Sequence, residues 1–393
     1  MKYRIKRNLL LVLFALIFLA GSFGMGYFSG RGSIICEVCP PQDLDFSLFW
    51  ETLKKLQESF VEPEKIDNET ILYGAISGMV DALGDPYTVF FNPEDTERFY
   101  EDIAGRFDGV GMEIAIRNNV LKVVAPLEGT PADKAGLRPG DQIIKINGEL
   151  TSDLSLDDAV SRIRGPKGTK VVLTIFRESW DVPKDIELTR AEIRVPSLKI
   201  EIMENNIAYI RIYQFSSEAG IDFSRIAVQV LTKGAEKIIL DLRNNPGGYL
   251  NIARDISGFF LKRGDLVVIE DFGDSQEEYR AAGTGIFSDY PLVVLINEGS
   301  ASGAEILAGA LRDNREVKLI GETSFGKGSV QQLETLTGGS SVKITIAKWL
   351  TPKGQTIEDI GLEPDIEIEI TDEDFEKDQD PQLDKAIEII KSL

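Results

Sequence analysis

The sequence contains no histidine among its 393 residues. A catalytic Ser-His-Asp or Cys-His arrangement is therefore excluded, and so is a zinc site with an imidazole ligand. Acid–base chemistry near neutral pH must then come from a carboxylate, a lysine, a tyrosine or a cysteine whose pKa is shifted by its surroundings. This absence restricts the chemistry before any motif is considered.

Positive charge is also in short supply. The chain has 43 Lys and Arg against 64 Asp and Glu, a formal net charge of −21. Such a surface repels the phosphate backbone, so we expect no nucleic-acid partner. The length corresponds to two or three domains at about 150 residues each, enough to bury a sizeable core.

Cysteine occurs only twice, as Cys36 and Cys39 in a C-x-x-C pair. Such a pair is typical of a redox centre or of half a zinc site. A zinc site needs four ligands, and the chain has no second pair. We interpret the two residues as thiols beside a membrane segment, and we expect no metal and no cofactor.

The N-terminus carries the longest apolar run. Residues 2–7 are basic, and residues 9–28 are apolar or small over a length sufficient to span a bilayer. Basic residues before such a span predict that this end is cytoplasmic and that the rest lies outside. A single-pass membrane anchor at 9–28 is therefore expected, with the main part of the chain extracytoplasmic. A cleaved signal peptide is the alternative, but no A-x-A site follows the run.

The rest of the chain changes character three times. Together with the anchor it gives an α+β multidomain fold, in which the last segment closes the core or pairs with a second copy in a homodimer. The predicted divisions are 1–40 (cytoplasmic tip, anchor and juxtamembrane segment), 41–104 (N-terminal helical region), 105–190 (β-rich module with one clear helix), 191–370 (alternating strands and helices) and 371–393 (acidic linker and C-terminal helix).

The 191–370 segment predicts an α/β core with crossover connections. Its strands are continuous apolar runs, which suits a sheet covered on both faces. The predicted strands are 208–212, 237–242, 291–296 and 317–320, and the predicted helices are 223–232, 250–260 and 302–312.

A small-residue loop, residues 297–305, follows the apolar strand that ends at Ile296. A helix is predicted to begin near Ser302, and its free N–H groups favour developing negative charge at that point. A helix cap formed by Ser300 or Ser302 is the alternative. The segment does not match the G-x-S-x-G elbow, because its central residue is Ala301.

Residues 321–331 admit several interpretations. A phosphate-binding P-loop would need Ser or Thr where Gly328 stands. An S-x-x-K site beginning at Ser324 should open a helix, which the glycines beside the lysine oppose. Lys327 can instead act as a general base if burial keeps it neutral, with Gln331 orienting the amine without adding charge. An ordinary surface lysine in a turn is the remaining alternative.

A third loop, Asp241 to Gly248, is rich in glycine and follows another buried strand. Its backbone N–H groups are suited to form half of an oxyanion hole. A plain turn is the alternative interpretation.

Together and in this order, these segments resemble the C-terminal processing peptidases, also called tail-specific proteases. The resemblance extends from about residue 45 to residue 390 and implies an α/β crotonase/ClpP-like serine peptidase core, an inserted PDZ domain and an N-terminal helical region. The segments that carry it are Gly84-Asp85-Pro86-Tyr87-Thr88, the β-rich module, 241–248, 297–305, and 325–328 with Gln331.

The resemblance also implies roles for single residues. Ser302 matches the nucleophile of the family and Lys327 matches its general base. Gln331 matches a supporting glutamine, and Asp313 matches an aspartate often implicated in support. The oxyanion donors match the backbone N–H groups of Gly247, Gly248 and Gly303.

The β-rich module resembles a PDZ domain. Its carboxylate-binding loop matches Gly109, Val110, Gly111 and Met112, and residues 131–141 match the turn and helix of that fold. In such a module, N–H groups bind a terminal carboxylate while the peptide adds as a strand. A PDZ-like domain used only for packing is the alternative.

The resemblance therefore implies a serine endopeptidase of the cell envelope that recognises and cleaves protein C-terminal tails through an acyl-enzyme. A non-catalytic PDZ scaffold of the envelope is the alternative. The presence of Ser302, Lys327 and Gln331 favours the peptidase.

Overall fold

The chain divides into two compact units, residues 1–72 and 73–393, in a computed structural model. The predicted anchor lies outside the described residues except at 18–23 and 25, and the Cys36/Cys39 pair lies wholly outside them. Within the described ranges, no helix is both long and apolar enough to cross a membrane. These ranges are 18–23, 25 and 44–393, without 118–119, 128, 153, 178, 372, 375–376 and 378.

The first unit contains short helices, as the sequence predicts for this region. They are α2 (Ser47–Ser59), η1 (Pro63–Lys65) and the start of α3 (Asn68–Asp81). The side chain of Asp67 accepts a hydrogen bond from the N–H of Thr70 at 2.8 Å, which caps the first turn of α3.

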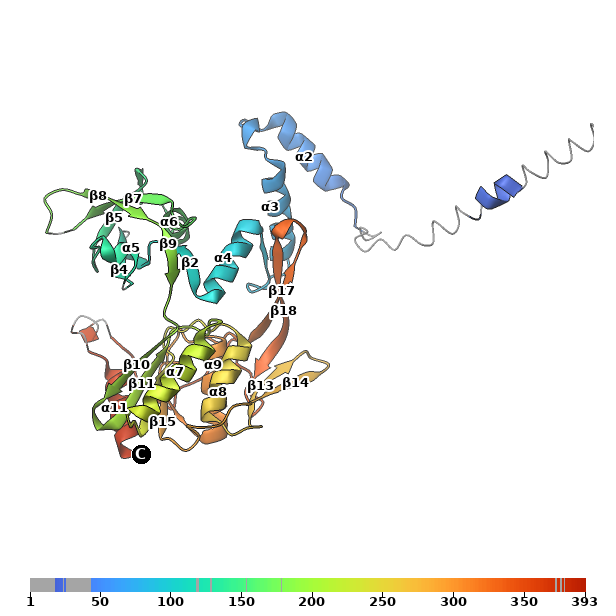
Figure 1. The fold of residues 1–393 in the computed structure, drawn as a ribbon. Coiled ribbons are helices and arrows are strands. Elements are labelled where there is room, and N and C mark those ends of the chain that lie inside the picture. Colours follow the sequence, from blue (N-terminus) through green and yellow to red (C-terminus); the bar gives the residue numbers. More distant parts are fainter. Residues whose placement is uncertain are drawn as a thin grey trace, which may run out of the picture. The chain divides into compact units, whose positions relative to one another are not determined.

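The second unit is built around a six-stranded sheet in the order β10-β11-β12-β15-β16-β19. Figure 1 labels β10, β11 and β15 of this sheet. All neighbouring strands are parallel except β10 and β11. The strands are β10 (Leu198–Met203), β11 (Ile207–Ile212), β12 (Lys237–Asp241), β15 (Leu292–Ile296), β16 (Lys318–Gly321) and β19 (Ile366–Glu367).

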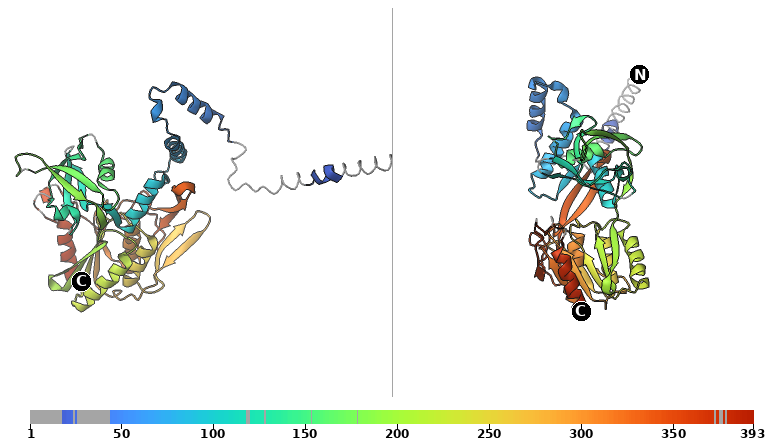
Figure 2. Two further views of the ribbon diagram at one scale, coloured as in Figure 1. Left: turned by 45° about the horizontal axis from the view of Figure 1, so that its top comes forward. Right: turned by 90° about the vertical axis from the view of Figure 1, so that its left-hand side faces the viewer.

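Both faces of this sheet are buried, as the apolar runs predict. On β15, Val294 and Ile296 pack in a cluster with three helices, whereas Val293 and Leu295 pack in another with the C-terminal helix. The right-hand view of Figure 2 shows the red C-terminal helix and the yellow-green helices on opposite sides of the sheet. The helices are α7 (Ala219–Thr232), α8 (Leu250–Phe260) and α9 (Gly303–Arg315) on one face and α11 (Pro381–Ser392) on the other.

A second, antiparallel sheet was not predicted from the sequence. Its order is β1-β18-β13-β14, with β17 paired to β18. Its longest pairing joins β17 to β18, which places residues 329–335 opposite residues 341–348. The strands are β1 (Val89–Phe91), β13 (Leu266–Asp271), β14 (Gln276–Arg280), β17 (Ser329–Thr335) and β18 (Ser341–Leu350).

The β-rich module forms a sheet of its own, in the order β3-β4-β5-β7-β8 with β6 beside β5. A separate two-stranded ribbon, β2–β9, flanks it. The elements are α4 (Pro93–Ala104), β2 (Arg106–Gly109), β3 (Met112–Arg117), β4 (Val120–Pro126), α5 (Pro131–Lys134), β5 (Gln142–Ile146), β6 (Glu149–Leu150), α6 (Leu156–Ile163), β7 (Lys170–Phe176), β8 (Lys184–Thr189) and β9 (Ala191–Arg194).

The C-terminal segment is tied to the core by a buried ion-pair network. Arg243 lies just after β12 and donates to Asp241 at 2.7 Å and to Asp380 at 2.8 Å. Tyr209 donates its hydroxyl to the same Asp241 at 2.6 Å. The predicted acidic linker is therefore fixed at its last residue, Asp380, next to the loop that leads to Gly247 and Gly248.

Candidate active site

Ser302 stands at the turn between β15 and α9, where the sequence places a candidate nucleophile. Its backbone has φ 51° and ψ −113°, a region that costs a residue with a side chain about 1–3 kcal/mol. α/β-hydrolases expose their serine on a similarly strained strand-to-helix turn. The chain thus builds a strained turn without the G-x-S-x-G sequence.

The strain at Ser302 is maintained by hydrogen bonds on both sides of the loop. The N–H of Ala301 donates to the carbonyl of Asn245 at 2.9 Å, and the N–H of Phe325 donates to that of Ser300 at 3.0 Å. The Ser300 hydroxyl donates to the carbonyl of Leu242 at 2.8 Å. Ser300 is fully buried, so its role is structural.

The glycines of the 241–248 loop lie against the serine. A Cβ on Gly247 would lie 2.7 Å from the Cβ of Ser302, and φ at Gly247 is +98°. Only glycine fits this close approach. A Cβ on Gly248 would lie 2.3 Å from the carbonyl oxygen of Phe215.

The three predicted oxyanion donors differ in availability. The N–H of Gly247 donates to the Asn245 side chain at 2.8 Å and is therefore occupied. The N–H groups of Gly248 and Gly303 have no acceptor among the described residues. Gly303 is also the first residue of α9, where the helix dipole favours negative charge. Two free donors thus flank Ser302.

Lys327 lies between Gly326 and Gly328, which allow its segment to pack closely against the backbone of residues 358–361. A Cβ on Gly328 would lie 2.1 Å from the N of Glu358, and one on Gly326 would lie 3.1 Å from the N of Gly361. The lysine is half-buried by this packing. Its Nζ lies 5.4 Å from the ring centroid of Tyr87 and has no hydrogen bond or ion pair within the described part of the chain.

Glu305 joins the serine to the lysine segment, a role that the sequence analysis did not assign. One carboxylate oxygen accepts the N–H of Ser302 at 2.8 Å and that of Lys327 at 3.1 Å. The other accepts the Ser324 hydroxyl at 2.6 Å and the N–H of Gly326 at 2.8 Å. The side chain is 1% exposed. A single buried carboxylate therefore fixes the spacing of the two loops.

Burial sets the ionisation of both groups. It lowers the pKa of the Lys327 amine below the ordinary lysine value, although the negative charges of Glu305 and Glu358 oppose the shift. Burial likewise raises the pKa of Glu305, against the four donors that stabilise its charge. A lysine with a lowered pKa and no bound partner is suited to accept a proton.

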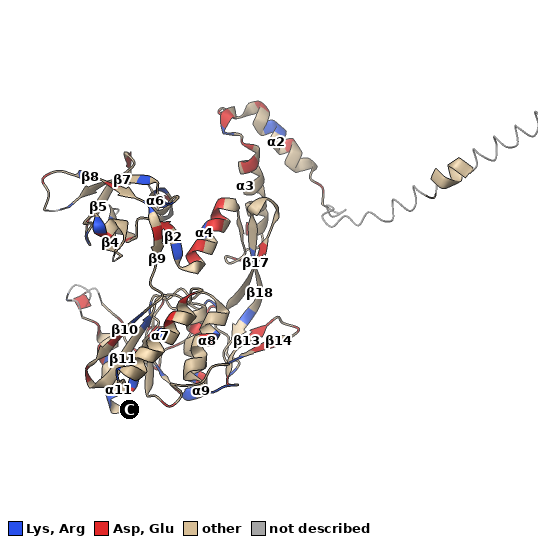
Figure 3. Cartoon of the chain, viewed as in Figure 1, with Lys and Arg blue, Asp and Glu red and all other residues tan. Residues whose placement is uncertain are grey.

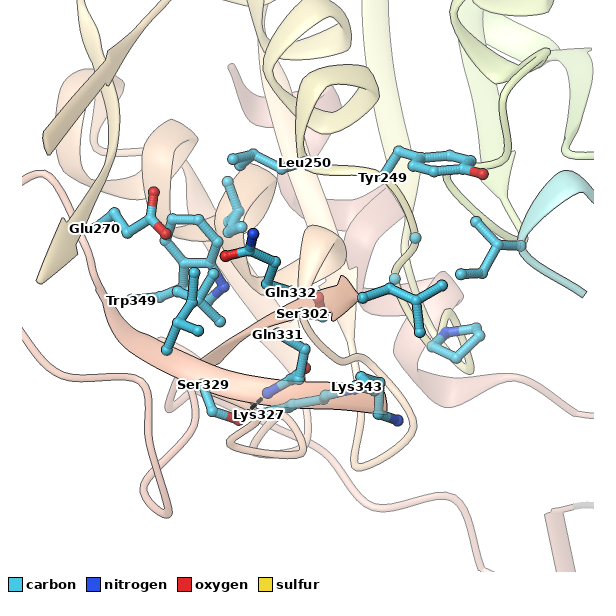
Figure 4. Close-up of a pocket in the computed structure, with 18 of the residues that line it drawn as sticks. Tyr249, Leu250, Glu270, Ser302, Lys327, Ser329, Gln331, Gln332, Lys343 and Trp349 are labelled. Atoms are coloured by element: carbon cyan, nitrogen blue, oxygen red, sulfur yellow. Dashed lines mark hydrogen bonds between the residues drawn. The ribbon is translucent and has the colours of Figure 1, made fainter. Parts of the chain in front are cut away.

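Ser302, Lys327 and Gln331 line one cavity of about 580 Å³, together with Gly247 and Gly248 (Figure 4). The sequence therefore predicted residues that the fold brings together. The expected contact between Gln331 and the lysine amine is not formed. Gln331 donates instead to the hydroxyl of Ser329 at 2.7 Å.

Asp313 lies elsewhere. It is near the C-terminal end of α9, and at 1.5 Å per residue its Cα is about 16 Å along the helix from Ser302. It accepts from the N–H of Lys353 at 3.0 Å and does not line the cavity that contains Ser302 and Lys327. Its observed role is to fix the turn after β18.

The predicted carboxylate loop lies between β2 and β3. Gly111 has φ +75°, and a Cβ there would lie 2.4 Å from the Cβ of Thr130. Thr130 donates its hydroxyl to the carbonyl of Gly111 at 2.8 Å. The N–H groups of Val110 and Gly111 have no acceptor in the described ranges. Gly109 ends β2, and Met112 begins β3, the edge strand of its sheet.

No group of three or more metal-ligating side chains lies together among the described residues. The chemistry at Ser302 and Lys327 can be derived from the chain's own groups.

Comparison with family profiles matches three parts of the chain. Residues 206–368 match Peptidase family S41, and residues 122–177 match the PDZ domain. Residues 45–95 match the Activating protease CtpB N-terminal domain.

Curated relatives cover most of the chain. A carboxyl-terminal-processing protease of Synechocystis is 40% identical over 320 residues, which are 80% of this chain and 74% of the relative. Carboxy-terminal processing protease CtpA of Bacillus subtilis is 38% identical over 309 residues, 79% of this chain and 66% of its own length. The chain thus spans about two thirds to three quarters of these relatives.

Solved structures give the same result for the fold. The photosystem II D1 C-terminal processing protease superposes with a TM-score of 0.53 at 28% identity, covering 82% of this chain and 92% of that one. A putative S41 protease from Bacteroides fragilis has a TM-score of 0.56 at 16% identity, covering 90% and 99%. The second likeness is one of fold alone.

Proposed function

The chain belongs to the family of carboxy-terminal processing proteases, peptidase family S41, and from that premise we propose that it cleaves proteins near their C-terminal tails with Ser302 as nucleophile and Lys327 as general base. One observation carries the proposal. The strained Ser302 and the unpaired Lys327 line one cavity and are joined through Glu305.

The proposed reaction follows from these positions. Neutral Lys327 takes the hydroxyl proton as Ser302 attacks the peptide carbonyl. The oxyanion accepts hydrogen bonds from the free N–H groups of Gly248 and Gly303. Lys327 then gives its proton to the leaving amine, and a water molecule activated by the same lysine releases the acyl group. Gln331 turns from Ser329 towards the amine when substrate binds.

The PDZ module supplies recognition in this proposal. The free N–H groups of Val110 and Gly111 bind the terminal carboxylate of a substrate, and its last residues add as a strand beside β3. Gly109 and Met112 complete the loop. Protein tails without stable structure are the substrates that such a mode accepts.

Cleavage of an unfolded protein with an apolar C-terminus tests the proposal. Ser302→Ala and Lys327→Arg are each expected to lower the rate at least about 10³-fold. The first variant lacks the attacking hydroxyl, and the second keeps a cation that cannot act as a base. Lys348→Arg makes the same exchange at an exposed lysine of β18 and should retain activity. A rate in Ser302→Ala equal to that of the wild type would refute the peptidase.

The strain at Ser302 also bears on the alternative of a non-catalytic scaffold. Ser302 is the N-cap of α9 and forms a capping box with Glu305, so the cap alternative is present in the structure. An N-cap residue ordinarily has extended backbone angles, however, whereas Ser302 has a positive φ. Strain of this kind concentrates at functional sites. The enzyme is therefore the better proposal.

Location, assembly and detailed fold type complete the proposal. Residues 9–28 anchor the chain in a membrane with its catalytic part outside the cytoplasm, as their apolar run after a basic tip indicates. The core is of the crotonase/ClpP-like type, and the chain forms a homodimer. Carbonate extraction of membranes tests the anchor, since a peripheral protein would be released, and light scattering of the detergent-solubilised chain tests the dimer.

A further inference from the structure

The cavity that contains Ser302 is also lined by a buried carboxylate with no role in the reaction described above. Glu270 lies on β13, is 5% exposed and lines the same cavity as Ser302. One of its oxygens accepts the hydroxyl of Tyr279 at 2.7 Å. Burial, together with this hydrogen bond, raises the pKa of Tyr279, so the tyrosine remains a donor.

Glu270 has no cationic partner among the described residues. No lysine or arginine nitrogen there lies within 4.0 Å of its oxygens, and Tyr279 is the only side-chain donor to it. Arg254, on the adjacent helix α8, pairs with Asp255 at 3.6 Å, although its charge acts on Tyr279. A buried carboxylate without a cationic partner is destabilising, so a ligand that supplies a cation there binds more tightly.

The pairing of β13 with β18 and two neighbouring aromatic rings place the Glu270 side chain at the cavity. Glu270 is paired directly with Trp349 on β18, which places both side chains on one face of the sheet. The rings of Trp349 and Tyr279 meet edge to face at 6.2 Å. Figure 4 shows Glu270 beside Trp349, away from the end of the cavity where Lys327 and Lys343 lie.

Two aliphatic side chains and the amide of Gln332 line the cavity between the proposed nucleophile and Glu270 (Figure 4). Ile306 is one turn along α9 from Ser302, and Leu250 begins α8 directly after the Gly247–Tyr249 loop. A side chain attached to the carbon that Ser302 attacks would pass these two residues before it reaches Glu270. An aliphatic stem with a cationic end fits such walls, because Trp349 and Tyr279 also favour a cation at their faces.

We propose that Glu270 is a specificity-determining residue, and that it selects lysine or arginine as the residue immediately before the cleaved bond. This inference rests on the proposed peptidase function. Charge around the cavity favours it further, because the described hairpin 266–280 carries five carboxylates and one arginine (Figure 3). Its potential attracts a basic segment.

Two peptides that differ only in the residue before the bond test the proposal directly. One carries lysine and the other norleucine, which has a similar stem and no charge. We expect kcat/KM of the wild type to be at least about tenfold higher for lysine, and this ratio to fall at least about tenfold in Glu270→Gln. Glu278→Gln removes the same charge from an exposed residue on the opposite face of β14 and should change the ratio less than about twofold.

The outcomes separate the inference from the activity. A wild-type ratio at or below one, or a ratio unchanged in Glu270→Gln, overturns the inference, and the first result needs no variant to fold. Binding of both peptides to Ser302→Ala, followed by fluorescence anisotropy, gives the second readout. If the lysine peptide binds more tightly in a way that depends on Glu270, but the wild type cleaves neither peptide, the proposed peptidase function is refuted. The role of Glu270 in selecting a basic side chain is then supported.

Discussion

The Ser302 side of the cavity stands on the buried six-stranded sheet, whereas the Lys327 side continues into the antiparallel pair β17–β18. On the first side, the backbone around Ser302 is bonded to the 241–248 loop, and Ser300 is fully buried. On the second side, the Lys327 amine has no polar partner among the described residues, and Gln331 turns to Ser329.

The two sides of the cavity therefore differ in how firmly their groups are held. The proposed nucleophile and the loop of its proposed oxyanion donors are held by hydrogen bonds, whereas the amine of the proposed base has no hydrogen bond among the described residues and Gln331 bonds to Ser329. Glu305 is the link, because it holds the backbone of both sides and leaves the amine of Lys327 unbound. Four substitutions test this comparison.

Gly247→Ala should have the largest effect, because it disturbs the fixed side. Its Cβ would lie 2.7 Å from that of Ser302, at a φ of +98°. We expect kcat/KM to fall roughly 10³-fold, from displacement of the serine together with backbone strain. Gly273→Ala is the matched control, since it has φ +88° and no atom within 4 Å of a Cβ. Activity within tenfold of wild type in Gly247→Ala would contradict the fixed geometry.

Glu305→Gln should rank second, because it breaks the link between the sides. One carboxylate oxygen becomes an NH₂ group that faces two donors, so two hydrogen bonds are lost. We expect about a 10²-fold loss in kcat/KM and a lower melting temperature. The acid limb of the pH profile should also move to lower pH, since Glu305 raises the pKa of Lys327. Glu298→Gln, an exposed residue of the serine loop, is the control. An acid limb that stays in place would show that Glu305 does not act on the base.

Gln331→Glu should have a smaller effect that depends on pH. A carboxylate near Lys327 raises the pKa of the amine, so the acid limb of kcat/KM moves to higher pH. Each unit of that shift lowers activity at neutral pH about tenfold, and the loss disappears where the lysine is fully neutral. Gln276→Glu adds the same charge on β14, where the side chain is exposed. A limb that moves to lower pH would exclude Gln331 from the environment of the base.

Asp313→Asn should have the smallest effect on activity. The residue is three turns from Ser302 and bonds to the N–H of Lys353. We expect kcat/KM within about twofold of wild type, with a slightly lower melting temperature from the weaker hydrogen bond. A loss above tenfold at an unchanged melting temperature would restore Asp313 to the catalytic mechanism.

The fixed side of the cavity was the predictable one. Continuous apolar runs at β12 and β15 indicated a sheet buried on both faces, and parallel strands bring the loops at their carboxyl ends together. Hence the positions of Ser302 and of the 241–248 loop followed from local pattern. Asp313 could also have been set aside from the sequence, because it lies eleven positions after Ser302, about three turns along the predicted helix.

The other side could not be predicted in the same way. β18 alternates polar and apolar residues, but β17 does not, because Gln331 and Gln332 are adjacent. The two strands form a local hairpin, whereas the pairing of β18 with β1 and β13 joins segments distant in sequence. The Ser302-x-x-Glu305 spacing indicates a helix-capping pair, but the bonds of Glu305 to Gly326 and Lys327 are tertiary. The partner of Gln331 is likewise set by the register of β17, which shifts between Val330 and Gln331.

The most direct test of a fixed serine activated by a neutral lysine is the pH dependence of labelling by a fluorophosphonate, with the modified residue identified by mass spectrometry. The account predicts modification at Ser302 alone, at a rate that rises through a single ionisation below the ordinary pKa of lysine, and no labelling in Lys327→Arg. Labelling at another residue, or an equal rate in Lys327→Arg, would contradict it.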